Sequence, residues 1–173
     1  MIFLFVAFFL FNRKGGSALK IITINYHNWE KYRRPLIRFT KRYDKAPKQP
    51  IHSYVFHLKK HHIEEAGNSI KIALWEGKII ACSVVVNFGT KLSAVLLAPK
   101  YKHTHIQRSL IESSMQDLGV MYKKIKYNDE AGIKMALQSG LVCFTYIHES
   151  DGQVYLWFGG GHWHSDDISE KEA

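Results

Sequence analysis

The sequence predicts an α/β (α+β) fold in which a mixed, mostly antiparallel sheet is flanked by helices. Apolar runs of strand length and segments of helical periodicity follow one another in the order β-α-α-β-β-β-α-β-α-β-β. Residues 91–119 contain a strand of the buried type that turns directly into a helix. The chain has 173 residues, of which 46% are hydrophobic, so it is long enough for one domain with a sizeable core.

The first half of the pattern contains one strand, two helices and a meander of three strands. Residues 19–26 alternate and are rich in β-branched side chains, as is typical of a strand. Asn28 can cap a helix that begins at Trp29, and Pro35 predicts a break in this helix. An apolar face within residues 51–63 predicts a second helix. The three strands, joined by short turns, are expected at residues 70–75, 78–88 and 91–98.

The second half adds a helix, a strand, another helix and a hairpin. Apolar residues recur at helical spacing over residues 106–118, and Gly119 is a suitable residue to end this helix. Asn128 or Asp129 can cap the next helix, which Gly140 ends. The remaining elements are expected at residues 120–127 (strand), 130–139 (helix), and 141–148 and 153–158 (hairpin).

We expect the folded domain to span residues 19–158, between an N-terminal extension with its linker, 1–18, and a polar tail, 159–173. The extension begins with eleven apolar residues, which are too few to cross a bilayer as a helix. It also lacks the charged start and the clear cleavage site of a signal peptide. Membrane association through residues 1–11 is left open.

Cysteine and histidine usage favours a cytoplasmic protein without a metal site. Cys82 and Cys143 both lie in apolar runs, as buried structural thiols do, and they cannot form a disulfide framework. The two His-x-His pairs lack a third ligand at a known spacing. The sequence also has no nucleophile elbow, Walker loop, HExxH or CxxC pair. The motifs typical of hydrolase, NTPase and zinc functions are therefore absent from it.

Positive charge is concentrated in the first third of the chain. The formal net charge is +9. Residues 1–62 hold 13 Lys and Arg but only two acidic residues, whereas the rest of the chain holds 11 Lys and Arg and 13 acidic residues. Such a charge attracts polyanions, which include nucleic acid, acidic protein and anionic lipid. A solvated basic surface is the simpler interpretation, and both are left open.

The turn that follows the strand at residues 91–98 suits an anion. Pro99 ends the strand, because proline cannot donate to a ladder, and a polar turn leads into the helix. A strand that passes into a helix in this way presents unpaired N–H groups and a positive dipole end at one point. We therefore expect phosphate binding here; a plain strand–turn–helix unit is the alternative.

Residues 94–110 resemble the central motif of the GNAT N-acetyltransferases: an apolar strand, then x-Pro-x-Tyr-(Arg/Lys)-Gly-x-Gly-(Ile)-Gly, then a helix. The matching positions are Pro99, Lys100, Tyr101, Lys102, Ile106 and Leu110. In the family the glycines let the loop close on the pyrophosphate of coenzyme A. Here the three glycine positions hold His103, His105 and Gln107, so the pyrophosphate-binding loop is degenerate.

A second segment, residues 128–141, resembles the later GNAT run Asn-x-x-(Ala/Ser)-Ile followed by Gly-Phe, with Asn128 or Asp129 at the asparagine position. In the family this helix carries a tyrosine that is often the general acid toward the departing thiolate. Met135 or Ala136 takes that position in this chain. The predicted order of elements is similar to that of the GNAT fold over nearly the whole chain.

The resemblance implies acyl transfer from a bound acyl-CoA. The residues implied in binding it are Leu97, Ala98, Lys102, His103, Thr104, His105, Ile106, Gln107, Arg108 and Asn128. A backbone N–H near Leu97 or Ala98 would polarise the thioester carbonyl. Tyr127 and Tyr146 are candidates for the acid by residue type alone, because a phenol can protonate a thiolate. The candidates for the base are His103, His105, Glu76 and His148.

The sequence thus predicts an N-acyltransferase that moves an acetyl group from acetyl-CoA, used as co-substrate, to a primary amine. The amine would be carried on an acidic molecule if it docks on the basic first third. The alternative is a catalytically inactive GNAT-like domain that binds CoA, protein or nucleic acid. Nucleic acid and a second copy of the chain remain further partner hypotheses.

Overall fold

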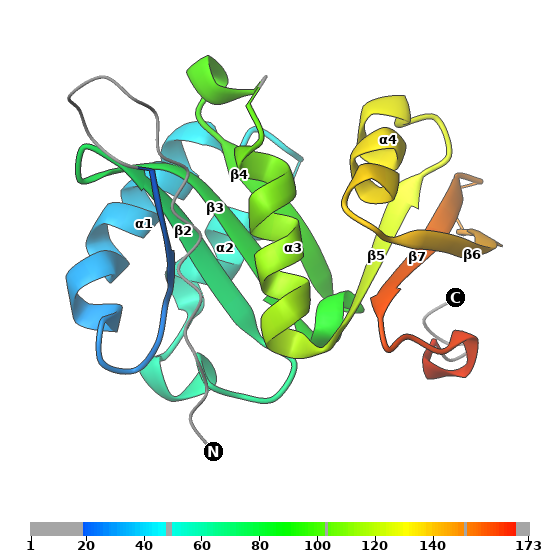
Figure 1. The fold of residues 1–173 in the computed structure, drawn as a ribbon, viewed down its shortest axis with the longest axis horizontal. Coiled ribbons are helices and arrows are strands. Elements are labelled where there is room, and N and C mark those ends of the chain that lie inside the picture. Colours follow the sequence, from blue (N-terminus) through cyan, green and yellow to red (C-terminus); the bar gives the residue numbers. More distant parts are fainter. Residues whose placement is uncertain (1–18, 48–49, 103, 151, 169–173) are drawn as a thin grey trace.

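The computed structural model describes residues 19–47, 50–102, 104–150 and 152–168, and its elements follow the predicted order (Figure 1). The apolar segment 1–11, its linker and His103 lie outside the described residues. The predicted α/β (α+β) class is confirmed: antiparallel sheets are flanked by helices. None of the described helices has the length and apolar content that crossing a bilayer requires.

The first sheet has four antiparallel strands in the order β1-β2-β3-β4. Their bounds are Lys20–Thr23 for β1, Ser69–Trp75 for β2, Lys78–Val86 for β3 and Leu92–Leu97 for β4. In the register of the three central strands, Ile72 pairs with Cys82 and Cys82 pairs with Leu96. The centres of β2 and β3 are buried on both faces, which explains their continuous apolar runs.

Helices cover both faces of this sheet. On one face, α1 (Trp29–Tyr43) and α2 (Pro50–His57) share a core cluster with alternate residues of β2 and β3. On the other face, α3 (Ile106–Leu118) packs through Leu110 against Ala73 and Ala81. The sheet is therefore the middle layer of three, and α3 follows directly from its last strand.

The second sheet has three antiparallel strands in the order β5-β7-β6, with bounds Val120–Lys126, Val154–Gly161 and Val142–His148. Helix α4 (Glu130–Gln138) packs on the face of this sheet that also meets α3. Ile111 of α3 and Ala136 of α4 belong to one cluster with residues of β5 and β7. Helix α3 thus joins the two sheets and returns the chain, so that β5 starts beside the beginning of β4 (Figure 1).

Several local predictions differ from the structure. The break predicted at Pro35 does not occur, because α1 continues through this residue, and Asn28 stands at the N-cap position but makes no side-chain capping bond. The helix expected over residues 51–63 ends at His57, because Lys59 takes an extended backbone and a 3₁₀ turn follows. The strand expected to end at Phe158 continues to Gly161, and Ile168 packs beyond it in a cluster with Trp157. Cys82 is buried as predicted, whereas the prediction is wrong for Cys143, which is exposed on β6.

Candidate functional site

The two sheets separate between β4 and β5, and the gap between them is the candidate site. The two strands belong to different sheets. Every residue of β4 remains partly exposed, in contrast to the buried centre of β3. Figure 1 shows the strands closest together where α3 ends and farthest apart where α3 begins. The two strands therefore diverge toward the start of α3, and the candidate site lies along the edges that they turn to each other.

One edge of β4 is used by the first sheet, and the other edge faces the gap. The N–H of Ala98 donates to the carbonyl oxygen of Ile80 on β3, at 2.9 Å. The carbonyl oxygen of Ser93 instead accepts from Lys123 of β5, at 2.7 Å. Because alternate residues of a strand present their backbone groups to the same edge, Val95 and Leu97 face the gap together with Ser93. Of the two predicted backbone donors, Ala98 is thus already bonded, and Leu97 faces the gap.

The loop after β4 leads into α3 through a 3₁₀ turn, Pro99–Tyr101. The N–H and the hydroxyl of Thr104 both donate to the carbonyl oxygen of Tyr101, at 3.2 and 2.7 Å. The bond from the N–H of Ser109 to the oxygen of His105 then begins the helix. Among the described residues, no acceptor is found for the four N–H groups of residues 105–108, so α3 opens with unpaired donors and a positive dipole end.

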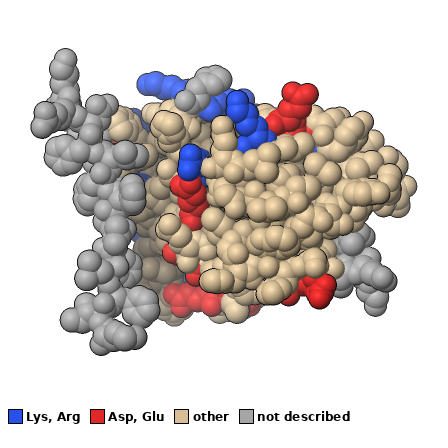
Figure 2. Space-filling model, turned by 45° about the vertical axis from the view of Figure 1, so that its right-hand side comes forward, with Lys and Arg blue, Asp and Glu red and all other residues tan. Residues whose placement is uncertain are grey.

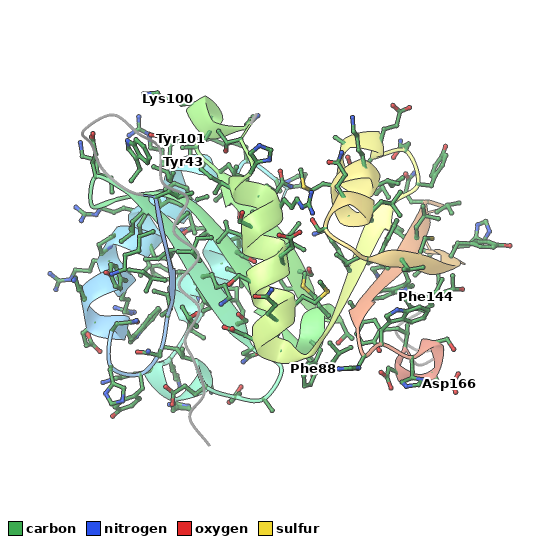
Figure 3. The ribbon with its side chains drawn as sticks, in the orientation of Figure 1. Tyr43, Phe88, Lys100, Tyr101, Phe144 and Asp166 are labelled. Atoms are coloured by element: carbon green, nitrogen blue, oxygen red, sulfur yellow. The ribbon has the colours of Figure 1, made fainter. Side chains whose placement is uncertain are left out.

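The side chains of this loop differ in their exposure. Four are exposed, Gln107 is half-buried and Ile106 is buried in the core under the sheet; the exposed ones are Lys102, Thr104, His105 and Arg108. The Arg108 Nε donates to the carboxylate of Glu112, one turn later, at 2.7 Å. This ion pair directs the guanidinium of Arg108 along α3. Figure 3 shows Tyr101 and Lys100 beside Tyr43 of α1, on the α1 side of the first sheet.

The structure settles which residue caps α4. The carboxylate of Asp129 accepts from the N–H of Gly132 at 2.9 Å, so Asp129 is the capping residue. Asn128 lies exposed in the turn between β5 and α4. At the position that the resemblance assigns to a tyrosine, Met135 is half-buried and Ala136 is fully buried in the core.

The predicted acid and base candidates lie on separate elements. Tyr127 follows β5 with 57% of its surface exposed, and Tyr146 lies on β6 with 63% exposed. Strand β7 separates β5 from β6, so the structure does not bring the two phenols together. Glu76 lies in the turn between β2 and β3, and His148 lies at the end of β6. Among the described residues, no three His, Cys, Asp or Glu side chains form a metal-binding group.

Lys123 is a residue of the gap that the sequence analysis did not assign to the site. It pairs with Phe158 of β7, which is fully buried in the cluster under α3 and α4. Burial lowers the pKa of its ammonium to about 8, although the charge of Asp129 opposes this effect. The sequence signal for this residue is the alternation of β5: Lys123 falls between Met121 and Ile125 on the apolar face of the strand.

A cavity of about 440 Å³ lies on the α2 side of the first sheet. It is walled by α2, the segment after it and the turn between β3 and β4, and Lys91 in its lining is two residues before Ser93. Its other polar lining residues are Ser53, Tyr54, His57, His62, Glu65, Asn68 and Asn87. Partial burial and the charge of Glu65 raise the pKa of Tyr54. The cavity can hold a small polar molecule close to the narrow end of the gap.

A second groove, of about 540 Å³, lies between α1 and the turn that joins β2 to β3. None of its described lining residues is acidic, and it combines three aromatic side chains with four cations: Lys31, Arg38, Arg42 and Lys78. Figure 2 brings the α4 side of the molecule forward, and on that face the blue Lys and Arg atoms lie mostly along the upper edge. This groove is a structured part of the predicted basic region.

Helix α2, which forms one wall of the cavity, depends on a buried carboxylate. Asp44 is 2% exposed, and its Oδ2 accepts from the N–H groups of Ile51 and His52 at 2.9 Å each. We expect Asp44→Ala to lower the free energy of unfolding by about 2–3 kcal/mol, because two N–H groups lose their acceptor. Urea unfolding measures this loss.

Asp129→Ala is the matched control, because this exposed carboxylate caps α4 through one N–H only. We expect this variant to lower the free energy of unfolding by about 1 kcal/mol. Asp44→Asn keeps one acceptor oxygen and should recover part of the loss. Equal costs for the two alanine variants would contradict the importance of the buried cap.

Neither a protein-family model nor a curated protein matches this sequence. Solved structures do match its fold. The ribosomal-protein-S18-alanine N-acetyltransferase from Escherichia coli is 13% identical with a TM-score of 0.59, over 85% of this chain and 96% of that one. The acetyltransferase of the GNAT family from Streptococcus pneumoniae is 11% identical with a TM-score of 0.53, over 83% and 98%. A chain of the NatC complex bound to Gag peptide and CoA is 10% identical with a TM-score of 0.60, over 84% and 99%.

Proposed function

We propose that this chain, which has the fold of the GNAT N-acetyltransferases, is an N-acyltransferase that moves an acetyl group from acetyl-CoA to a primary amine. The observation that carries the proposal is the gap between β4 and β5, which opens beside unpaired N–H groups at the start of α3. Two strand edges that diverge toward anion-binding donors suit an extended ligand with a diphosphate at one end.

The diphosphate of the donor would bind at the first turn of α3. The N–H groups of residues 105–108 supply hydrogen bonds, and the helix dipole supplies a favourable potential. Lys102 and Arg108 add positive charge at the surface of the same loop. The side chains of His105 and Gln107, at two of the glycine positions, narrow the approach, so binding would depend more on these charges than on a close-fitting backbone.

The reacting thioester would lie deeper in the gap, along the free edge of β4. Leu97 is the last residue of β4 and lies beside the proposed diphosphate site. The Val95 N–H, one step deeper on the same edge, would therefore donate to the carbonyl oxygen of the thioester as negative charge develops on it. The amine acceptor would approach from the cavity beside Lys91, where Glu65 attracts a cationic molecule. An acceptor carried on an acidic partner would also engage the basic groove beside α1.

The alternative function is that of a catalytically inactive module that binds CoA, protein or nucleic acid. Two observations favour it: the glycine positions of the loop carry larger side chains, and Met135 or Ala136 stands where the family has a tyrosine. Such a module would bind the donor without turnover, or would use only its basic groove.

The first test is calorimetry with acetyl-CoA, combined with an assay of thiol release over a panel of primary amines that includes polyamines and peptide N-termini. We expect binding and amine-dependent thiol release. Binding without release from any amine would support the inactive module. Failure to bind would overturn the proposal and leave salt-dependent retention on nucleic acid as the next measurement.

A negative charge introduced at the start of α3 tests whether the diphosphate binds there. Gln107→Glu adds a negative charge beside the unpaired N–H groups and should weaken CoA binding by about tenfold, which corresponds to 1.4 kcal/mol. Gln116→Glu makes the same change near the other end of α3, where the side chain is exposed. Equal weakening by both variants would show that the diphosphate does not bind at the first turn.

A further inference from the structure

Lys123 occupies the narrow part of the gap on the face that α3 and α4 cover. Its neighbours on this face of β5, Met121 and Ile125, are 1% and 4% exposed, and its partner across the ladder, Phe158, is fully buried. All three belong to the cluster to which α3 contributes Ile111 and α4 contributes Ala136. The lysine is therefore a cation set in an otherwise apolar face.

The Lys123 ammonium spans the two sheets. Its Nζ donates to the carbonyl oxygen of Ser93 at 2.7 Å, and the Ser93 hydroxyl is buried without a hydrogen-bond partner among the described residues. A buried hydroxyl without a partner can bond a further polar group, such as a ligand atom or a water. Ser93 therefore holds Lys123 through its carbonyl oxygen and has a hydroxyl that is still unused.

Lys123 also lacks the carboxylate partner that a structural lysine would have. Among the described residues, no Asp or Glu oxygen lies within 4.0 Å of its Nζ, whereas Lys71 pairs with Asp117 and Lys124 pairs with Glu149. The proton of Lys123 is thus not tied to a fixed counter-charge. A buried lysine without such a pair is a candidate for a functional role.

We propose that Lys123 is the general acid of the reaction, which protonates the thiolate as it leaves the acyl group. This inference rests on the proposed function. It assigns to β5 the proton transfer for which α4 has no suitable residue, since Met135 and Ala136 carry no acidic proton. The two exposed phenols, Tyr127 and Tyr146, lie outside the cluster that surrounds the gap.

The electrostatic surroundings suit this role. Burial lowers the pKa of Lys123 to about 8, so the ammonium is charged at neutral pH and yet can give up its proton. The charge of Asp129 on α4 acts in the opposite direction. On the other elements, Arg108 and Glu112 of α3 form their own pair, and Lys124 projects to the opposite face of β5. Ser93 of β4, which accepts from Lys123, and Phe158 of β7, which pairs with it, are uncharged.

The neutral amine of the acceptor attacks the thioester carbon and forms the new C–N bond, and the C–S bond breaks with its electron pair on sulfur. Lys123 transfers a proton from Nζ to sulfur, which gives the free thiol and a neutral lysine. The acceptor nitrogen loses one proton to water, and Lys123 regains one from water, so the site returns to its starting state.

Two substitutions separate the proton from the charge. Lys123→Met removes both, whereas Lys123→Arg keeps a charged donor that does not release its proton in proteins. With acetyl-CoA we expect both variants to lower kcat by about 100-fold, the usual lower range for loss of a general acid. We expect the kcat of the wild type to fall above pH 8, where Lys123 loses its proton, and we expect this fall to be absent in both variants.

A donor with a better leaving group tests the acid role directly. An S-nitrophenyl thioacetate releases an aryl thiolate that needs no proton, so wild type and Lys123→Met should react at nearly equal rates with it. The matched control is Lys124→Met, because Lys124 lies on the opposite face, paired with Glu149 and over the Trp157 ring. Melting curves for each variant confirm that it is folded.

The outcomes distinguish this inference from the proposed function. Wild-type protein that releases no thiol with any amine overturns the proposed function and the inference with it. Wild-type turnover that Lys123→Arg retains at a similar rate overturns the inference alone. An acetyl group found on Lys123 by peptide mass spectrometry also overturns it, because the lysine would then be a nucleophile.

Discussion

Asp117→Ala is expected to lower the free energy of unfolding by about 3 kcal/mol, because it leaves a buried lysine without its counter-charge. Lys71 lies at the centre of β2 and is 2% exposed. Its Nζ donates to Asp117 Oδ2 of α3 at 2.5 Å and to Thr23 Oγ1 of β1 at 2.8 Å. Without Asp117, the hydroxyl of Thr23 is the one hydrogen-bond partner left to Lys71 among the described residues.

Urea unfolding of matched variants measures this effect. Glu112→Ala breaks another ion pair of α3, with Arg108 at 2.7 Å, but both side chains of that pair are exposed to solvent by 36% or more. Its expected cost is about 0.5 kcal/mol. The double variant Lys71→Met with Asp117→Ala should regain most of the lost stability, because no unpaired charge is then buried. Equal costs for the two single variants would contradict this account.

The Lys71 contact matters for the site because it fixes α3 against the first sheet at the end opposite to its unpaired N–H groups. Ser114, one turn from Ile111, forms a second polar contact when its hydroxyl meets that of Ser83 at 3.3 Å. Two polar contacts and an apolar stripe therefore hold this helix in one position. The donors at its first turn are consequently held in a fixed direction toward the mouth of the gap.

The sequence predicts the parts of this fold that depend on neighbouring residues. Helix α3 begins and ends as predicted, since the apolar spacing and Gly119, at a φ of +75°, act within one helical turn. Helix α2 ends earlier than predicted because Leu58 and Ile63 both reach the core through an extended turn. Its N-terminal cap, Asp44, comes from beyond the preceding loop, and no local spacing indicates it.

The candidate site likewise has a part that the local sequence predicts and a part that depends on the tertiary structure. The loop from Pro99 to α3 is a local unit, and its place at the end of a strand follows from the sequence. The separation of β4 from β5 is a property of two sheets and depends on which strands pair, so neither strand shows it alone. Lys123 follows the apolar alternation of β5, but only the gap explains why a lysine can stand there.

Gly89→Ala is expected to have the largest effect, with a loss of more than about 4 kcal/mol or failure to fold, because an added Cβ would collide with backbone. Gly89 has a φ of +96°, and its Cβ would lie 1.9 Å from the carbonyl oxygen of Tyr122 in β5. This contact joins the turn after β3 to the narrow end of the gap, one residue from Lys123. Separation here would break the contact of Lys123 with Ser93.

Gly77→Ala isolates the collision from the backbone preference. Gly77, in the turn between β2 and β3, has a φ of +72°, and no atom lies within 4 Å of the Cβ that alanine would add. It should cost only the strain of a left-handed backbone, about 1–2 kcal/mol. Chemical unfolding of both variants, or their soluble yield if Gly89→Ala does not fold, gives the comparison. Stabilities that agree within about 1 kcal/mol would mean that the close approach of β5 to this turn does not exist, since strain alone would then explain both losses.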